Sequence, residues 1–227
     1  YKVTRTEHDA RWYPPCPWDW FYGPGYWWFA YDYAWWPGWR GWGCAKPTPW
    51  WWQSWGGRQP PEVVAEGEAP IGKDGTLAIP IDTALAKAVH PDDDHRYAIT
   101  AEVTDASRRT IVGTGAVLVA RKPFKVYAWV DRGYCRTGDA LNAHFCARTL
   151  DGKPVAKAAA SVRLLKVSYK DGQPVEAEVQ AWDLATDADG QGRVQMKAAP
   201  PGQYRVVASV TDARNHRIEA AYVFVVY

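Results

Sequence analysis

Histidine, cysteine and carboxylate side chains are the groups in this sequence that could carry out chemistry, and their spacing favours no catalytic site. None of the five histidines has a serine or cysteine nucleophile at a spacing typical of a hydrolase, and a GxSxG segment is absent. Phosphate-binding loops of the GxxxxGK[ST] and GxGxxG types are absent as well. We therefore expect a protein that is not an enzyme and that uses no cofactor. The histidines are His8, His90, His95, His144 and His216.

The densest group of possible metal ligands is the segment HPDDDH at residues 90–95. Histidine and aspartate are suitable ligand types for a divalent metal. These side chains are nearly consecutive, however, and consecutive residues imply no geometry fixed by the fold, so we favour a solvated acidic loop and no metal site. His144 lies in the segment LNAHFCA on the side that we expect to face solvent, which indicates a surface histidine.

The four cysteines are not spaced like zinc ligands, because no CxxC pair occurs. Cys16 and Cys44 bracket the most unusual part of the chain and could close it as a disulfide loop in an oxidising compartment. Cys135 and Cys146 flank a turn, but a simple hairpin would not place them opposite each other. We therefore expect no bridge between the second pair.

A tryptophan-rich segment interrupts the first part of the chain. Between Trp12 and Trp55, 44 residues hold thirteen of the fifteen tryptophans. Monomeric proteins seldom expose apolar patches beyond ~600 Å², so most of this aromatic surface must be covered. Prolines and glycines exclude a long helix. We expect residues 10–61 to form an irregular insertion that packs on itself and on its host domain.

Three roles compete for this insertion: a structural plug that cements neighbouring domains, a ring surface that stacks on sugars, and contact with a membrane interface or a protein partner. Sugar binding would also need carboxylates and amides beside the rings, and few are present. The plug is therefore the preferred hypothesis. The candidate interface or ligand-stacking aromatics are Trp27, Trp28, Trp35, Trp36, Trp50, Trp51 and Trp52.

The elements that position these groups are organised as a repeat. Residues 95–120 and 202–227 align without a gap at eight identical positions. In each copy an alternating apolar strand, a polar turn and a second apolar run predict a β-hairpin. The tyrosines that open the two strands, Tyr97 and Tyr204, are either corner tyrosines that bond back to the backbone or ordinary core residues.

Other segments also have counterparts in the two copies. Residues 1–9 correspond to the strand VRLLKVSY at 162–169, and about 40 residues of the module precede that strand in the second copy. The segment KDGTLAIPID predicts a turn at Asp74-Gly75 followed by a strand, and residues 82–89 predict a short helical turn. The first copy thus lacks its opening strands, which would leave an unpaired edge and an uncovered core face.

The segment DRGYCRTGDALNAHFCARTLDGKPV at 131–155 resembles the start of a macroglobulin domain of the α2-macroglobulin and complement superfamily. These repeats read D-[KR]-x-x-Y-x-P-G-x-x-[VL], followed by a strand and an acidic-Gly turn with Pro-Val. Cys135 stands where the pattern has tyrosine, unless Tyr134 takes that role, and Thr137 stands where it has proline. The matching residues are Asp131, Arg132, Gly138, Leu141, Leu150, Asp151, Gly152, Pro154 and Val155.

The resemblance implies an all-β fold of two tandem immunoglobulin- or fibronectin-like macroglobulin β-sandwich domains. Residues 1–122 would form the first, incomplete at its N-terminus and carrying the insertion at 10–61, and residues 123–227 the second, which is complete. It further implies a non-catalytic scaffold segment of a bacterial α2-macroglobulin-like protease trap, a fragment of a larger extracytoplasmic chain. The sequence holds neither the CxEQ thioester segment of that family nor a convincing bait segment.

The implied partners are other domains of the same parent chain, which would supply the missing strands of the first domain, and proteases that the full-length protein meets. Nucleic acid is not expected, because the net charge is +2 with acids and bases interspersed. No run of 18 apolar residues occurs, so membrane association would come only through the parent chain. The alternatives are a surface module that binds carbohydrate or a partner through the tryptophan-rich insertion, and a structural cell-envelope assembly protein.

Overall fold

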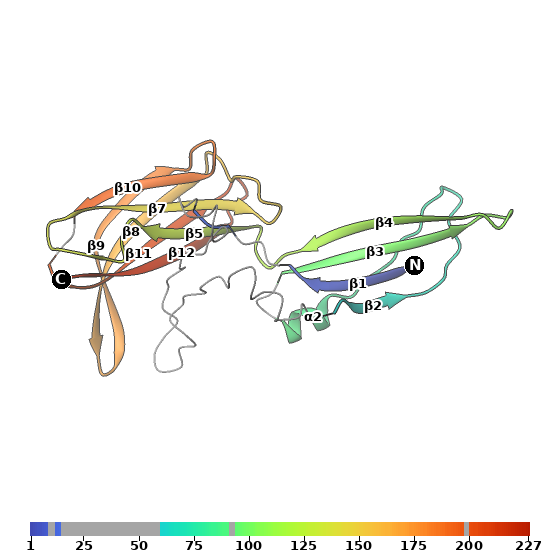
Figure 1. Cartoon of the computed structure of the whole chain (residues 1–227), viewed down its shortest axis with the longest axis horizontal. Helices are drawn as coiled ribbons and strands as arrows, with labels where there is room; N and C mark the ends of the chain where they lie inside the picture. The colour runs from blue at the N-terminus through green and yellow to red at the C-terminus, as the bar shows by residue number, and fades with distance from the viewer. Residues whose placement is uncertain (9–11, 15–59, 91–93, 198–199) are drawn as a thin grey trace, which may run out of the picture. The chain divides into compact units, whose positions relative to one another are not determined.

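A computed structural model describes residues 1–8, 12–14, 60–90, 94–197 and 200–227, which fold into two compact units (Figure 1). The described residues of the first unit lie within 1–8 and 60–121, and those of the second within 12–14 and 122–227. Among the residues just given, every regular element is a β-strand except one six-residue helix. The expected all-β fold class is therefore confirmed.

The second unit is a β-sandwich of two sheets. A three-stranded sheet in the order β10-β7-β5 faces a five-stranded sheet in the order β6-β12-β11-β8-β9 (Figure 1). All pairings are antiparallel except that of β6 with β12. The strands are β5 (Phe124–Val130), β6 (Tyr134–Cys135), β7 (Ala140–Thr149), β8 (Ala159–Lys170), β9 (Gln173–Ala185), β10 (Gln191–Lys197), β11 (Gly202–Thr211) and β12 (Arg217–Val226).

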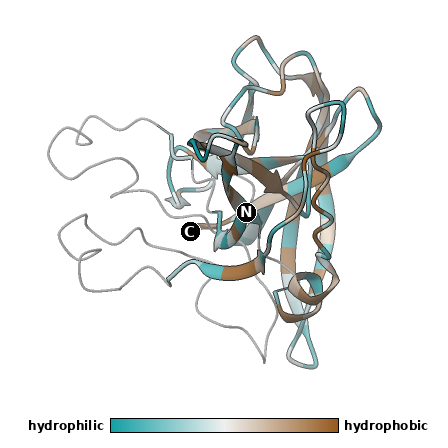
Figure 2. Cartoon of the chain, turned by 90° about the vertical axis from the view of Figure 1, so that its right-hand side faces the viewer, coloured by the Kyte–Doolittle hydropathy of each residue, from teal (hydrophilic) through white to brown (hydrophobic). Residues whose placement is uncertain are grey.

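One hydrophobic core fills the space between these two sheets, because alternate residues of each strand point inward. Figure 2 shows hydrophobic residues concentrated in the strands and hydrophilic residues at loop tips. Burying each large side chain stabilises the fold by about 1.5–3 kcal/mol. The largest fully buried members of the core are Tyr204, Phe124, Phe145, Leu141, Val162, Val206, Val210 and Val226.

Tyr204 is a corner tyrosine, as one of the two sequence hypotheses predicted. Its hydroxyl donates a 2.7 Å hydrogen bond to the carbonyl oxygen of Pro200, and its ring stacks on Phe224 with centroids 5.7 Å apart. The equivalent Tyr97 of the first unit is also buried, and its ring lies 6.4 Å from that of His95.

The first unit is a single antiparallel sheet in the order β2-β1-β3-β4. A short helix, α2 (Ala84–Val89), confirms the helical turn expected at 82–89. Among the described residues of this unit there is no second sheet. The strands are β1 (Lys2–Glu7), β2 (Glu62–Glu66), β3 (His95–Thr104) and β4 (Thr110–Val119).

The four strands of the first unit match β9-β8-β11-β12 of the second, pair for pair. Val3 faces Ile99 across the β1–β3 ladder, just as Leu164 faces Val206 across β8–β11. The β-bulge recurs as well: the β1–β2 register skips Val64, and the β8–β9 register skips the residue at the equivalent place, Val179. The predicted correspondence of the first residues with 162–169 is therefore confirmed.

The two repeated hairpins close with the same aspartate-centred turn, at Asp105 and at Asp212. In each, the backbone N–H groups two and four residues later donate to the aspartate Oδ1 at 2.7–2.9 Å. Arg108 and Asn215 occupy the same left-handed position of the turn, with φ near 62° and 63°. Both predicted hairpins, β3–β4 and β11–β12, are confirmed.

The predicted strand after the turn at Asp74-Gly75 is wrong. The turn itself forms, with Gly75 at φ 78° and the Thr76 N–H donating to Asp74 Oδ1 at 3.1 Å. Residues 76–83, however, belong to no strand, and Leu77 is exposed. The equivalent strand β10 of the second unit pairs only with β7, and the described part of the first unit contains no counterpart of β7. An apolar alternation without a neighbouring strand does not form a ladder.

The tryptophan-rich segment lies in the connection between β1 and β2. The equivalent strands of the second unit, β8 and β9, are joined by a two-residue turn, Asp171-Gly172, in which both residues have positive φ. In the first unit the chain leaves the sheet after Glu7 and returns at Glu62, where the side chains of Arg5 and Glu62 form an ion pair. The insertion thus replaces a tight turn.

Candidate functional site

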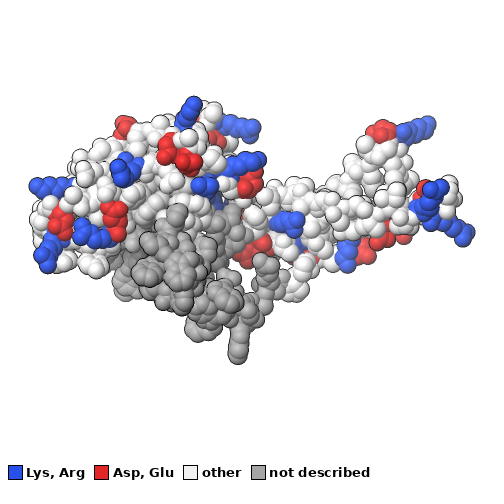
Figure 3. Space-filling model, turned by 45° about the horizontal axis from the view of Figure 1, so that its top comes forward, with Lys and Arg blue, Asp and Glu red and all other residues white. Residues whose placement is uncertain are grey.

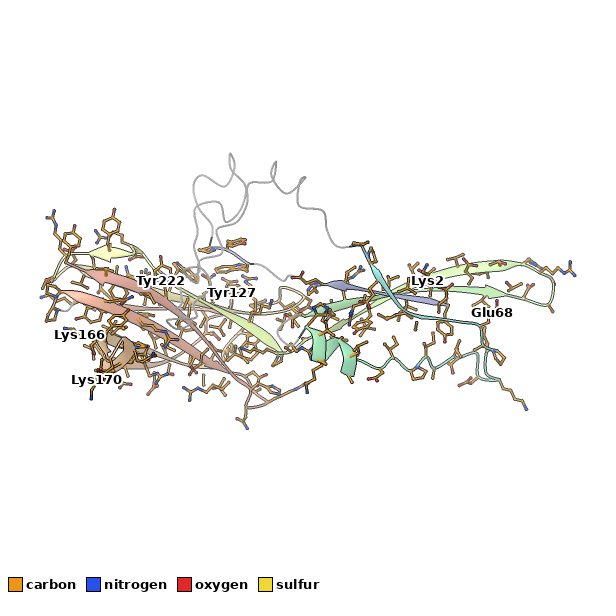
Figure 4. The ribbon with its side chains drawn as sticks, turned by 90° about the horizontal axis from the view of Figure 1, so that it is seen from below. Lys2, Glu68, Tyr127, Lys166, Lys170 and Tyr222 are labelled. Carbon is orange, nitrogen blue, oxygen red and sulfur yellow. The ribbon has the colours of Figure 1, made fainter. Side chains whose placement is uncertain are left out.

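The most elaborate side-chain cluster in the described chain lies on the outer face of β5 and β7. Residues of β5 alternate between the core and this outer face, which places Tyr127, Trp129 and Asp131 outward. Across the ladder, Trp129 is paired with His144 and Tyr127 with Cys146. We call Tyr127, Trp129 and His144 the aromatic platform; Figure 4 labels Tyr127 on it.

Trp12, at the start of the tryptophan-rich segment, lies on this platform. Its ring centroid is 5.5 Å from those of Tyr127 and Trp129, with an interplanar angle of 48° in each case. The guanidinium carbon of Arg148 lies 5.4 Å from the centroid of the Trp12 ring. Tilted aromatic pairs contribute about 0.5–1.5 kcal/mol each beyond their buried area, and a cation–π contact adds about 0.5–1 kcal/mol. The contacts therefore anchor this part of the segment to the second unit.

His144 is held in a fixed orientation by a ring and a carboxylate. It stacks on Trp129 with centroids 5.4 Å apart and planes 10° apart, and its Nε2 lies 2.6 Å from Asp131 Oδ1. The other oxygen of Asp131 accepts hydrogen bonds from the Asn142 side chain at 2.6 Å and from its backbone N–H at 3.0 Å. Partial burial raises the pKa of Asp131, but the hydrogen bonds from His144 and Asn142 outweigh it, so this pKa lies below its ordinary value.

The outward orientation of His144 was predicted correctly, but its contacts with Trp129 and Asp131 were not. The signal was present in the sequence, since Trp129 and Asp131 are two residues apart on the same face of one strand. Their pairing with His144 needed the β5–β7 register, which the sequence does not fix.

Cys135 and Cys146 are both buried and both free. Cys135 belongs to the core between the sheets. Cys146 lies on the outer face of β7, opposite Tyr127 in the β5–β7 ladder and two residues before Arg148. Burial raises the pKa of the Cys146 thiol, which Arg148 lowers in part. Burial raises the pKa of the Cys135 thiol as well. Both are therefore neutral thiols of low reactivity at neutral pH, and no bridge joins them in the structure.

The described ends of the segment at 90–95, His90 and Asp94-His95, are less solvated than the expected acidic loop. Its last two residues are buried, and Asp94 Oδ1 accepts a 2.9 Å hydrogen bond from the Arg121 N–H. The His90 carbonyl accepts a hydrogen bond from the Arg121 guanidinium at 3.0 Å, and the His90 and His95 rings lie 5.6 Å apart. These contacts hold His90 and Asp94 next to Arg121, which follows β4. Outside the undescribed residues 91–93 and the other gaps, no three side chains are grouped as metal ligands would be.

The remaining histidines and the candidate residues of the insertion lie elsewhere. His216 pairs with Asp212 at 2.9 Å in the β11–β12 turn, and His8 follows β1. The candidate disulfide of Cys16 with Cys44 lies outside the described residues and stays a prediction. So do the seven candidate aromatics, Trp27, Trp28, Trp35, Trp36, Trp50, Trp51 and Trp52.

Fold and site together define an all-β protein of repeated sheets. Its most developed surface in the described part is a set of aromatic rings in contact with one another. Where the structure describes the chain, no helix has the length and apolar character needed to cross a membrane.

The sequence is similar to that of a bacterial α2-macroglobulin. It is 33% identical over 118 residues to Alpha-2-macroglobulin of Ralstonia nicotianae, a match that covers 46% of this chain and 7% of that protein. No family model matches the sequence. The resemblance carried by residues 131–155 is thus borne out, and the chain spans less than a tenth of the curated relative that it matches.

Solved structures that resemble this chain in part include those of two further bacterial α2-macroglobulins. The native conformation of the Escherichia coli protein matches all of this chain and 14% of its own, with a TM-score of 0.44 and 10% identity. The Salmonella protein reacted with methylamine matches 60% of this chain and 10% of its own, with a TM-score of 0.38 and 12% identity. The sporulation control protein Spo0M of Bacillus subtilis covers 46% of this chain and 49% of its own, with a TM-score of 0.33 and 11% identity. Likeness at this level says nothing about function.

Proposed function

We propose that this chain is a non-catalytic scaffold segment of a larger, extracytoplasmic, α2-macroglobulin-like protein of bacterial type. Two macroglobulin-type domains, at 1–122 and 123–227, would provide contacts with neighbouring domains. The observation that carries this proposal is the 33% identity to a bacterial α2-macroglobulin. The recurrence of four strands, their registers and their bulge in both units supports the tandem arrangement.

The packing of Trp12 supports the plug hypothesis for the tryptophan-rich insertion. A ring that is already in contact with Tyr127, Trp129 and Arg148 is not free to stack on a sugar. A carbohydrate-binding module would present such a ring to solvent with polar groups at its edge. The insertion would then pack against residues of the same chain, as Trp12 does, and would not present a ligand-binding surface.

The protease-trap role belongs to the larger protein and is tested there. The longer protein encoded by the same reading frame is digested briefly with trypsin or elastase and followed by native gel electrophoresis and mass spectrometry. We expect cleavage in one hypersensitive segment outside residues 1–227, a change in mobility and retention of the protease. Uniform cleavage without retention would exclude the trap, whereas primary cleavage within 1–227 would place the bait in this chain.

A further inference from the structure

We propose that β10 is an edge strand at which an acidic, extended segment of another polypeptide binds as an additional β-strand. The segment would carry two carboxylates four residues apart on its outward side and apolar side chains on its inward side. The proposal goes beyond the scaffold function and does not rest on it. It follows from the backbone, the charges and the apolar surface at this edge of the three-stranded sheet.

The open edge of β10 presents backbone groups at every second residue. Among the described residues β10 pairs with β7 alone, so its other side has no neighbouring strand there. The Gly190 carbonyl accepts a 2.8 Å hydrogen bond from the Ala147 N–H of β7. Residues of an antiparallel ladder direct their N–H and C=O groups alternately to its two sides. Those of Val194 therefore point toward β7, and those of Arg193 and Gln195 point to the open edge, where a further strand could pair with them.

The β10 edge is regular, whereas other edges of the second unit are interrupted or short. Its register with β7 runs without a shift from Gln191 to Lys197. β9, an edge of the five-stranded sheet, contains Pro174 and a register shift at Val179. β6, at the opposite edge of that sheet, has two residues. Prolines and bulges hinder the addition of a strand, and a short strand offers few hydrogen bonds. β10 is thus the better template of the three.

The outward side chains of β10 alternate between amides and cations. They are Gln191, Arg193, Gln195 and Lys197. Arg193 and Lys197 are exposed, and neither forms an ion pair with another residue that the structure describes. Asp131, on the same face, does not neutralise them, because His144 and Asn142 occupy its two carboxylate oxygens. The two cations are therefore available to the carboxylates of a partner.

The arginines on the outer face of the five-stranded sheet differ, because each has a carboxylate partner in the chain. Arg205 lies 3.2 Å from Glu176, and Arg163 and Arg217 lie 3.6 and 2.9 Å from Glu219. On the face of the second unit that Figure 3 shows, lysines and arginines are interspersed with aspartates and glutamates. Two unpaired cations on one strand depart from this balance, and acidic groups of a partner would restore it.

An apolar surface lies beneath the place of the added strand. The three-stranded sheet ends at β10, which contacts β9 of the opposite sheet. Trp182 and Leu184 of β9 pack against the core but remain partly exposed, unlike Val194 and Met196 of β10, which are buried. A strand beside β10 would direct alternate side chains inward, toward Trp182 and Leu184. A partly exposed tryptophan of this kind is typical of the centre of a binding surface.

The charges of β10 also determine which partner fits. In an antiparallel pair of two β10 strands centred on Gln195, Arg193 of each copy would lie opposite Lys197 of the other. Like charges directly opposite each other destabilise such a pair, whereas opposite charges stabilise it. Arg193 and Lys197 are about 13 Å apart along the strand at 3.3 Å per residue. The carboxylates of the partner should therefore be four residues apart as well.

A fluorescent peptide tests this proposal by anisotropy with the 227-residue chain. The probe is Thr-Val-Glu-Val-Gln-Val-Glu-Val-Thr, which in extended form places both glutamates on one side and the valines on the other. In the matched control the second glutamate is exchanged with the valine before it, so that this carboxylate faces Trp182. We expect the control to bind more weakly by about tenfold or more. Equal affinity of the two peptides, or no binding of the probe, would overturn the proposal.

Charge reversal in the chain tests the two cations. The double variant Arg193→Glu, Lys197→Glu should bind the probe more weakly by about tenfold or more, and should bind the same peptide with lysines in place of the glutamates. Lys170→Glu reverses an exposed cation at the end of β8, labelled in Figure 4, and should change the affinity by less than about twofold. Failure of the lysine peptide to bind the double variant, or an equal loss in Lys170→Glu, would contradict the proposal.

Three measurements distinguish other occupants of this edge. The amides of Arg193 and Gln195 should exchange with deuterium about tenfold more slowly when the probe is bound, and unchanged exchange would exclude strand addition. Heparin, a polyanion without a peptide backbone, should not displace the probe at physiological salt; displacement would show a general anion site. Sedimentation should show no dimer that protects the same amides, since such a dimer would assign the edge to a second copy. The readout is peptide binding and not protease capture, so either proposal can fail while the other holds.

Discussion

Replacing Trp12 with alanine should release the start of the tryptophan-rich segment from the aromatic platform. The substitution removes two ring contacts at 5.5 Å and the cation–π contact with Arg148 at 5.4 Å. Each aromatic pair contributes about 0.5–1.5 kcal/mol and the cation–π contact about 0.5–1 kcal/mol. Taken near the lower end of these ranges, the three contacts together amount to about 2 kcal/mol of lost interaction free energy. Since about 1.4 kcal/mol is tenfold in an equilibrium constant, the platform should open roughly 30-fold more often.

Cys146 provides the assay, because its thiol is fully buried on the same face, opposite Tyr127 in the ladder. The protein is pulsed with a maleimide at fixed pH, and labelling of each cysteine peptide is followed by mass spectrometry. We expect Cys146 to react roughly 30-fold faster in Trp12→Ala, by the estimate above. Cys135, which belongs to the core between the sheets, is the internal reference for global unfolding.

Trp12→Phe is the conservative control, since it keeps a ring over the platform and should restore most of the protection of Cys146. Equal labelling rates in Trp12→Ala and the wild type would refute the anchoring role of Trp12. Faster labelling of Cys146 and Cys135 together would show that the substitution unfolds the unit instead.

Three further predictions concern the second unit, and the last of them uses a glycine of the first unit as its control. Tyr204→Phe removes the corner hydrogen bond and should lower the free energy of unfolding by about 0.5–1.5 kcal/mol in urea titrations; an unchanged midpoint would contradict this role. Because the pKa of Asp131 is lower in the folded state, its contribution to stability is present above its ordinary pKa of 3.8 and is lost as the pH falls through the folded value. Asp131→Asn should therefore flatten the decline in stability below pH ~4, seen as a change in Tm with pH. Gly192→Ala would place a Cβ 2.3 Å from the Phe145 ring and should cost about 1–3 kcal/mol, whereas Gly113→Ala, with open space around it, should cost far less.

The repeated hairpins could be predicted from the sequence because their information is local. Alternating apolar residues followed by Asp105 or Asp212 specify a strand and a turn within a few residues. The segment from Leu77 has the same alternation, yet it forms no strand, because a strand needs a hydrogen-bonding neighbour that the pattern cannot guarantee.

The candidate site was less predictable, because it depends on which residues meet across strands. The outward side of His144 followed from alternation, but its contacts with Trp129 and Asp131 depend on the β5–β7 register. The position of Trp12 depends on packing between segments more than 100 residues apart, which leaves no periodic signal in the sequence. Composition alone indicated that such rings must be covered, without indicating by what.

The connection between β1 and β2, which holds the insertion, can change in length without disturbing the sheet. Its two ends are held next to each other by the ladder and by the Arg5–Glu62 ion pair. Because loop-closure entropy rises only with the logarithm of length, lengthening a two-residue turn to residues 8–61 costs roughly 3 kcal/mol. Evolution could therefore lengthen, shorten or exchange this connection without altering a residue of the sheet, and a chain with Asp-Gly in its place should keep the registers of β1 and β2.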